Sequence, residues 1–344
     1  MPAGLKVLAP GLHTTVQDLG RIGWQMLGVP VSGALDALAL GLGNALVGNP
    51  PELAALEILY SGPTLEVAAD MARVAVAGIG AGLPIEGQGR GTLPAWQSVT
   101  LPRGAVFRIV PGPQSVCAYL AVEGGIAVPS VLGSASTLAR AGLGGFNGRA
   151  LRQGDVLPLA IARAPPRTEQ RLPRPPPATS GEPIRVVLGP QQEYFTDNAM
   201  AALLGAEFRV SAAADRMGMR LDGPRLRHRH GWDIVSDAIA TGAIQVPGSG
   251  QPVLLLADHQ TTGGYPKIAT VISADLPLVG RRRPGDVLRF EAVTIEEAEH
   301  LARDAERRLA ALIASLEPVS GGARIDLASL YTGNLISGIV SARD

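Results

Sequence analysis

Short apolar runs separated by breaks rich in Gly, Pro and Asp dominate the hydrophobic pattern of this chain. The runs are four to six residues long. They lie at Arg73–Ala77, Val106–Val110, Ala118–Val122, Ala243–Val246, Val253–Leu256, Ile268–Ser273 and Val287–Phe290. Breaks at intervals of about 8–15 residues are typical of barrels and sandwiches. The pattern therefore predicts a mainly β protein with a few short helices.

Apolar spacing of helical type is confined to a few segments. One predicted helix covers 36–47, with Asp36 as its N-cap and Gly48 after its end. A second, shorter helix is predicted over 196–205, where Thr196 can cap its first turn.

The last predicted helix is amphipathic and covers 294–316. Thr294 and Glu297 have the spacing of a capping box. A β-like run at 334–340 follows in the tail, and we expect it to add a strand to a sheet formed earlier in the chain.

A proline-rich stretch divides the chain into two halves with related motifs. The first half contains VLAPG, DLGRIG, SGPTLEV and GDVLPL, and the second half contains VLGPQ, ADRMG, DGPRL and GDVLRF in the same order. Four matching signals favour a duplication. We therefore predict a β-rich domain over 1–161, an extended linker over 162–183 and a second β-rich domain over 184–344.

Composition and charge exclude several classes of protein. Thirty Lys and Arg balance thirty Asp and Glu, so no net charge is available to attract nucleic acid or an anionic membrane. The sequence offers no signal peptide and no apolar stretch of about 20 residues, and Cys117 is its one cysteine. A cytoplasmic protein is expected. The only lysines are Lys6 and Lys267, which makes Lys267 conspicuous.

Several familiar motifs are absent from the sequence. It contains no GxxxxGKS or GxxxxGKT phosphate loop, no HExxH, no GxSxG and no Met-Lys-Met acceptor for biotin. His228 and His230 form a His-x-His pair, but Arg227 and Arg229 would repel a cation there. We therefore expect a solvated basic edge at this pair and no metal site.

A dense polar cluster follows the apolar run 253–256 and ends at Lys267. Amide groups of a Gly-Gly turn, two hydroxyls and an ammonium can together hold an anion. We predict Lys267 and Asp258 as catalytic residues, with Asp258 as a base or as the group that orients the lysine. The predicted substrate-binding residues of this segment are Gln260, Thr261, Thr262, Gly263, Gly264 and Tyr265. The alternative is a plain hairpin with positive φ at Gly-Gly and a solvated lysine.

Four more residues are candidates for substrate binding. Arg216 in DRMGMR and Arg21 in DLGRIG can each hold a carboxylate or phosphate bidentately, although structural Asp–Arg pairs are equally common. Ser32 lies before a predicted helix whose N-terminus can receive an anion. Gln245 can point into the same pocket as Lys267 or simply shape a bend.

Two polar residues lie among apolar neighbours. Asn44 falls within the first predicted helix, and Glu57 within an apolar stretch that follows it. Buried polar groups need partners, so we expect both side chains to be hydrogen-bonded inside the fold.

Taken in order, these motifs resemble a known family. TTVQDLGRIG, GVPVSGALD, DRMGMRLDGP, GAIQVPG, LLADHQTTGGYPKIATVISADLP and NLISG together resemble the biotin-dependent carboxyltransferase / allophanate hydrolase subunit 2 family, nearest to its branch of C-type (KipA-like) 5-oxoprolinase subunits. The resemblance covers nearly the whole chain. It implies two tandem cyclophilin-like β-barrel domains.

The resemblance also implies an activity and partners. It implies hydrolysis of 5-oxo-L-proline to L-glutamate with ATP, together with a KipI-like B-type subunit and a LamB/YcsF-like A-type subunit. ATP would be bound by, or shared with, a partner subunit. Relatives fused into urea amidolyase imply an alternative, in which a carboxyl group passes from biotin on a separate carrier to urea or a similar amide. A second alternative is a regulatory binding module of the KipI-like partner.

Some positions differ from the usual pattern of this family. His259 stands where an arginine is usual, Ala135 and Leu138 replace the Arg and Tyr of GSRSTY, and Gly80 replaces the Asp of TGAD. If these positions contact the substrate, the substrate differs from that of typical members.

Overall fold

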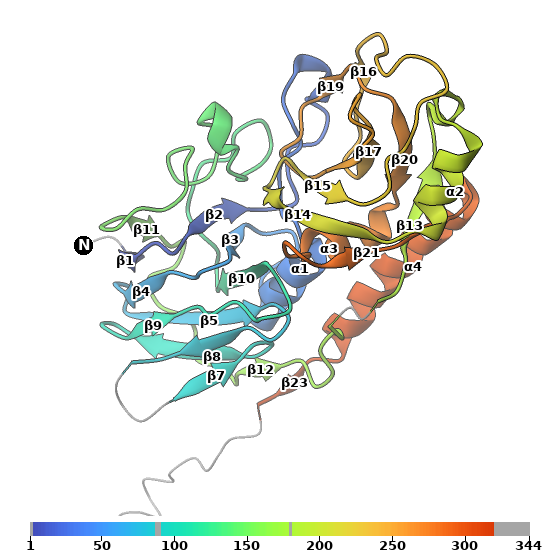
Figure 1. Ribbon diagram of the computed structural model, residues 1–344. Coiled ribbons are helices and arrows are strands. Elements are labelled where there is room, and N and C mark those ends of the chain that lie inside the picture. The colour runs from blue at the N-terminus through green and yellow to red at the C-terminus, as the bar shows by residue number, and fades with distance from the viewer. Residues whose placement is uncertain (1–2, 87–90, 179–180, 320–344) are drawn as a thin grey trace, which may run out of the picture.

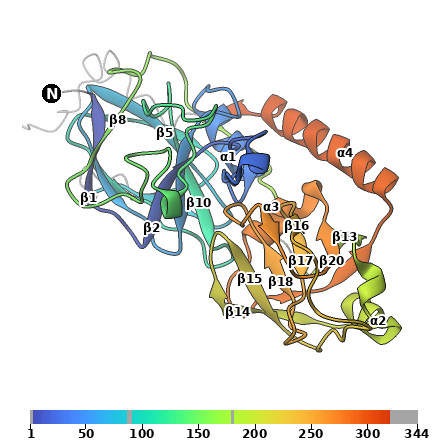
Figure 2. The same ribbon diagram turned by 90° about the horizontal axis from the view of Figure 1, so that it is seen from above.

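The computed structural model describes residues 3–86, 91–178 and 181–319. It is mainly β, and its two halves lie side by side with helices α1, α3 and α4 near their junction (Figures 1 and 2). The strand predicted at 334–340 lies outside the described residues.

The first half consists of two antiparallel sheets with a shared apolar core. One sheet has the order β11 (Val156–Pro158), β1 (Gly4–Ala9), β4 (Thr64–Val67) and β9 (Val106–Arg108). The other has the order β2 (His13–Gln17), β3 (Ala55–Leu59), β10 (Cys117–Val122), β5 (Met71–Ala77) and β8 (Ser98–Pro102). β6 (Gly82–Pro84) and β7 (Thr92–Pro94) form a separate pair. Alternate residues of the two sheets, such as Leu65 and Leu120, meet in the core between them.

The second half contains an eight-stranded sheet. Its order is β21 (Val287–Leu288), β14 (Phe208–Ala214), β15 (Gly218–Asp222), β18 (Val253–Leu255), β17 (Ala243–Gln245), β20 (Lys267–Val271), β13 (Ile184–Leu188) and β22 (Phe290–Ala292). Short strands β16 (Asp237–Ala238) and β19 (Thr262–Gly263) pair with each other, as do β12 (Gln170–Arg171) and β23 (Glu317–Pro318).

The sheet of the second half nearly closes into a barrel. The single strand predicted over 287–290 is divided in two at Arg289, and the two pieces lie at opposite ends of the sheet order. Leu288 pairs with Phe208 at one end, and Phe290 pairs with Ile184 at the other. One residue between the pieces is enough for the chain to leave one edge and join the other, which brings the edges together.

The three helices predicted from the sequence are confirmed with their caps. They are α1 (Ala37–Leu46), α2 (Asp197–Gly205) and α4 (Ile295–Ala314). Asp36 and Thr196 cap the first two, and Thr294 forms a capping box with Glu297 at the third. The sequence pattern missed α3 (Leu276–Gly280), because five residues are too few to show a helical period. The structure also has 3-10 turns η1 (Gln25–Leu27), η2 (Ala139–Ala141), η3 (Gln192–Tyr194) and η4 (Ser273–Asp275).

Helix α4 lies along the second half, and its C-terminal part packs against α1 of the first half (Figure 2). A Cβ atom at Gly41 would lie 3.4 Å from Leu309 Cδ2, so Gly41 faces α4 at van der Waals distance. The stretch predicted as a linker is extended but lies against the first half. Arg73 donates to the carbonyls of Pro165 at 3.1 Å and Arg167 at 3.0 Å. Whether the halves are independent domains stays a prediction.

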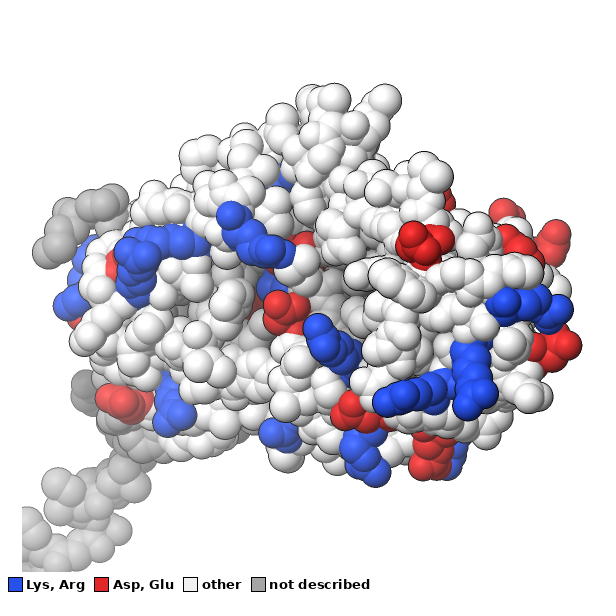
Figure 3. All heavy atoms as spheres, turned by 45° about the horizontal axis from the view of Figure 1, so that its top comes forward, with Lys and Arg blue, Asp and Glu red and all other residues white. Residues whose placement is uncertain are grey.

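Charged side chains of both signs are interspersed on the face seen in Figure 3, and neither sign forms a continuous patch there. This distribution agrees with the balanced composition. Among the described residues, no helix is long and apolar enough to cross a membrane.

Candidate functional site

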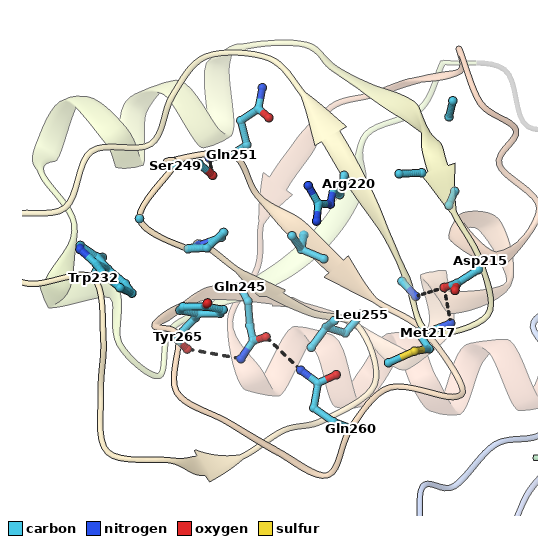
Figure 4. A pocket seen from close by; sticks show the side chains of 17 residues that line it. Asp215, Met217, Arg220, Trp232, Gln245, Ser249, Gln251, Leu255, Gln260 and Tyr265 are labelled. Carbon is cyan, nitrogen blue, oxygen red and sulfur yellow. Dashed lines mark hydrogen bonds between the residues drawn. The ribbon is translucent and has the colours of Figure 1, made fainter. Parts of the chain in front are cut away.

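A pocket of about 840 Å³ lies on one face of the second-half sheet (Figure 4). Arg220 on β15, Val253 on β18 and Gln245 on β17 lie opposite one another and form a row across three strands. Their neighbours Met219 and Leu254 belong to the apolar core on the other face. Because side chains alternate along a strand, the row projects into the pocket while its neighbours pack inward.

Aromatic and amide side chains form one side of this pocket. The rings of Trp232 and Tyr265 lie 6.2 Å apart. Gln245 Nε2 donates to the carbonyl of Tyr265 at 3.4 Å, and Gln260 Nε2 donates to Gln245 Oε1 at 3.5 Å (Figure 4). A Cβ at Gly263 would lie 2.8 Å from Gln245 Nε2, so a larger residue there would displace the end of the Gln245 side chain. Three predicted residues, Gln245, Gln260 and Tyr265, therefore line the pocket.

Two arginines of one motif point in different directions. Arg216 lies in the turn between β14 and β15, and Arg220 lies on β15. Asp215 Oδ1 accepts hydrogen bonds from the amides of Met217 at 2.8 Å and Gly218 at 3.2 Å, which fixes the turn. Arg216 points into the junction between the halves and is 6% exposed, whereas Arg220 lines the pocket.

Arg216 lies in a buried polar network. Its guanidinium donates to both carboxylate oxygens of Asp258, at 2.8 and 2.9 Å, to the carbonyl of Gly33 at 2.7 Å, and to Glu57. Burial alone would lower the pKa of Arg216, but the charges of Glu57 and Asp258 raise it above the usual value. The Ser32 hydroxyl lies 2.7 Å from Asp258 Oδ1. The structure thus brings Arg216, Asp258 and Ser32 together, with the guanidinium occupied by internal acceptors.

Glu57 connects this network to the first half. Its carboxylate accepts from the amide of Leu35 at 2.8 Å and from the Tyr119 hydroxyl at 2.6 Å. The pKa of Tyr119 is raised by burial and by the charge of Glu57, which keeps the hydroxyl a donor. The same hydroxyl accepts from the amide of Asp36, whose carboxylate pairs with Arg281 Nε at 2.5 Å. The expectation that Glu57 is hydrogen-bonded inside the fold is confirmed.

Asn44, the other polar residue expected to be bonded inside the fold, is fully buried in α1. Its side-chain amide donates to the carbonyl of Leu53 at 2.5 Å, and Asn49 donates to its Oδ1 at 3.1 Å. This expectation is also confirmed.

Lys267 lies apart from the junction network. Its ammonium donates to Asp237 Oδ2 at 2.7 Å, and its side chain is 4% exposed. The hydrogen bond from Lys267 lowers the pKa of Asp237. The prediction that Asp258 orients the lysine is wrong, because the chain turns Asp258 towards Arg216. Lys267 is not among the residues that line the pocket, and its catalytic role stays a prediction.

The segment between Asp258 and Lys267 forms β19 and its flanks. The carbonyl of Thr261 accepts from the amide of Ile239 at 3.0 Å, and the carbonyl of Gly264 accepts from Ile234 at 2.9 Å. Thr262 and Gly263 pair with β16. Neither glycine of the pair adopts positive φ, unlike the turn of a plain hairpin. Anion binding by these groups stays a prediction.

Arg21 is buried near the junction and is not among the pocket residues. It donates to the carbonyls of Val131 at 3.4 Å and of Ser136. Its Nη1 has no hydrogen-bond partner among the described residues. The neighbouring Asp18 accepts from the Ser134 hydroxyl at 2.6 Å and fixes the loop.

His259 lies between the junction network and the pocket. Its Nδ1 is 2.6 Å from the carbonyl of Gln260 and its Nε2 is 3.1 Å from the Thr241 hydroxyl. Since a carbonyl only accepts, Nδ1 carries the proton and Nε2 accepts from Thr241. Burial lowers the pKa of His259, so the ring is neutral near pH 7.

The other departures from the family pattern are not among the pocket residues. The amide of Ala135 donates to Asp18 Oδ2 at 2.6 Å, and Leu138 is buried. Gly80 adopts positive φ in the turn before β6, a conformation that suits glycine.

His228 of the His-x-His pair contacts other residues of the second half. The Nε2 atom of His228 lies 3.0 Å from the carbonyl of Val246, and its ring packs 5.0 Å from that of Phe195. Over the described ranges, no three His, Cys, Asp or Glu residues are grouped so as to hold a metal ion.

Most of the residues that line the pocket were not predicted as site residues from the sequence, and Arg220 and Trp232 are among them. Arg220 ends the quoted DRMGMR motif, and the apolar alternation of Met219 and Leu221 around it would have placed it on the opposite face. Trp232 follows an irregular basic segment and carries no comparable signal.

Similarity to known proteins extends over most of the chain. Residues 27–292 match the family model described as "Carboxyltransferase domain, subdomain A and B". The chain belongs to this carboxyltransferase-domain family. The resemblance drawn from the sequence motifs is thereby confirmed.

Relatives of this chain include a 5-oxoprolinase subunit and longer urea enzymes. The chain is 36% identical to the C-type subunit of 5-oxoprolinase from Escherichia coli over 305 residues, which cover 88% of this chain and 96% of the relative. It is 31% identical to urea amidolyase of Saccharomyces cerevisiae, covering 87% of this chain but 17% of that protein. The crystal structure of urea carboxylase from Kluyveromyces lactis superimposes with a TM-score of 0.83 at 29% identity, covering 93% of this chain and 30% of that one.

Proposed function

We propose that this protein is the C-type subunit of an ATP-dependent 5-oxoprolinase, which hydrolyses 5-oxo-L-proline to L-glutamate. The observation that carries the proposal is the match to the Escherichia coli protein over 96% of its length. The urea enzymes share the domain but are several times longer, and the match covers 17% of the Saccharomyces cerevisiae protein and 30% of the Kluyveromyces lactis one. Similarity to one named subunit of an enzyme also implies that other subunits complete it.

The proposal also covers the domains, the location and the partners of this chain. We infer two tandem cyclophilin-like domains over 1–161 and 184–344, a cytoplasmic location, and partners of the KipI-like B type and the LamB/YcsF-like A type. The pocket lining contains one cationic side chain, Arg220, and no lysine. A triphosphate is usually held by several cationic groups and a metal ion. We propose that a partner subunit, or an interface with it, binds ATP.

The proposed chemistry uses the buried charges and amides around the pocket. ATP would phosphorylate the lactam oxygen and leave as ADP. Water would then add to the activated carbon, the ring C–N bond would break as the nitrogen takes a proton, and a second water would release phosphate and leave glutamate. Lys267 would stabilise developing negative charge from its position beside Asp237, and the amides of Gly263 in β19 and of Gly264 directly after it would do the same. Asp258, paired with Arg216, would hold the junction in register rather than move a proton.

The second candidate is carboxyl transfer, and the family model itself favours it. One reconstitution separates the two functions. The chain is purified with its A-type and B-type partners, and ATP hydrolysis and glutamate release are measured with 5-oxo-L-proline. Urea with a carboxybiotin carrier is tested in parallel. Glutamate release supports the first candidate, and carboxylation of urea without glutamate release would replace it with the second.

A further inference from the structure

Arg220 is an exposed cation in a pocket that apolar side chains, the carboxylate of Asp215, amides and aromatic rings also line. Across residues 3–86, 91–178 and 181–319, no hydrogen bond or ion pair engages its guanidinium. Its neighbour Arg216, four residues earlier, bonds to two carboxylates and a carbonyl. An arginine that projects from the middle of a strand into a cavity, with its forked donors unused, is suited to bind a carboxylate bidentately.

The amide side of the pocket lies at a fixed distance from this cation. Arg220 and Gln245 are separated by β18 in the same row of the sheet. Two strand spacings place their backbones about 10 Å apart. Both residues line the same pocket, and this spacing suits a small ligand with different groups at its two ends.

The two glutamines retain hydrogen-bonding capacity. The contacts of Gln245 with the Tyr265 carbonyl and with Gln260 are long, at 3.4 and 3.5 Å. Each side-chain amide has two N–H donors and an oxygen with two lone pairs. A cyclic amide presents one N–H and one carbonyl, and this pair of glutamines can satisfy both. Trp232 and Tyr265 supply an apolar wall for ring methylenes.

We propose that Arg220 binds the carboxylate of the substrate and that the pocket therefore selects small cyclic amides that carry a carboxylate over neutral amides. This inference rests on the proposed function and deepens it by naming the substrate-selecting residue. Gln245 and Gln260 bind the amide end of the same ligand. Urea has no carboxylate and would leave Arg220 without a partner.

Two measurements test the selection. The first is calorimetric titration of the full chain with 5-oxo-L-proline, with 2-pyrrolidinone, which is the same ring without the carboxylate, and with urea. The second is KM and kcat in the reconstituted complex. We expect the wild type to prefer 5-oxo-L-proline over 2-pyrrolidinone by about tenfold to a hundredfold, as for a charge-assisted hydrogen-bond pair.

Variants then assign the preference to one residue. Arg220→Gln should raise KM for 5-oxo-L-proline about tenfold to a hundredfold with little change in kcat, and should abolish the preference over 2-pyrrolidinone. Arg220→Lys should keep part of the preference, because it keeps charge but loses the fork. The control is Arg103→Gln, which removes an exposed arginine that pairs with Asp70 on the first half.

The outcomes separate this proposal from the proposed function. Equal affinity of the wild type for the two rings, or an unchanged preference in Arg220→Gln, overturns the role of Arg220 even where the complex releases glutamate. A preference that depends on Arg220 in the titration, without glutamate release by the complex, supports the site and rejects the function. Absence of both binding and turnover overturns both. The comparison of the two rings on the wild type needs no variant and stands even if a variant does not fold.

Discussion

The junction between the halves and the pocket of the second half use the same kinds of side chain in opposite ways. At the junction, Arg216 is held by Asp258, Glu57 and a carbonyl and is almost inaccessible. In the pocket, Arg220 projects from the next strand with no charged partner in the described structure, beside glutamines with long hydrogen bonds.

This difference distinguishes polar side chains that stabilise the fold from polar side chains that can bind a ligand. A buried charge whose donors are all satisfied by the protein rigidifies the fold and leaves nothing for a substrate. A guanidinium in a cavity whose donors are not bonded to the protein adds little rigidity but can donate hydrogen bonds to a substrate. The two arginines lie in one six-residue motif, so motif membership alone does not assign a role.

The largest expected effect comes from breaking the junction network. Arg216→Met leaves Glu57 and Asp258 as buried carboxylates without their cation. Removal of one partner of a buried pair typically costs about 3–5 kcal/mol. We expect the free energy of unfolding in urea, followed by circular dichroism, to fall by about this amount.

The matched control is Arg220→Met, the same change four residues along the chain. Substitution at a residue without internal partners should change the free energy of unfolding by less than about 0.5 kcal/mol. Equal loss of stability in the two variants would contradict the distinction between the junction and the pocket.

The sequence predicted contacts between residues that are near in the chain but not contacts between the two halves. Local signals were sufficient for the caps at Asp36, Thr196 and Thr294, because a cap bonds only to the next turn. The partner of Arg216 is different: Glu57 lies 159 residues away and meets it only through packing of the two halves.

In the candidate site, too, local features were predicted and contacts between distant segments were not. The sequence pattern found the segment with Gln260 and Tyr265, because polar residues between two strands are a local feature. It paired Lys267 with Asp258, which is near in sequence, whereas the partner is Asp237 on a strand formed by a distant loop. Side-chain direction at Arg220 was available from strand alternation. The depth of the pocket was not, since loops from several segments enclose it.

A second prediction asks whether Lys267, which lies in neither region, takes part in the reaction. Lys267→Ala in the reconstituted complex should lower kcat for 5-oxo-L-proline at least about a hundredfold, as expected when an electrostatic stabiliser is removed. Asp237→Asn is the companion variant, since it keeps the lysine and removes the charge of its partner. Near-normal turnover in Lys267→Ala would show that Lys267 is not needed for the reaction and that other residues or a partner subunit carry it out.

The smallest expected effect concerns His259, which lies between Asp258 of the junction and Gln260 of the pocket. Burial lowers its pKa in the folded state below the usual value of about 6.5. On acidification the unfolded chain therefore takes up the proton first, so the contribution of His259 to stability is complete above pH 6.5 and declines below it. Between pH 7.5 and 5.5 the loss should reach up to about 1 kcal/mol.

Urea unfolding of His259→Gln across the same range checks this, because that variant should lose less stability than the wild type. Parallel pH profiles would show that the ring is free to accept a proton in the folded state, and hence that the boundary between the two regions is open to water.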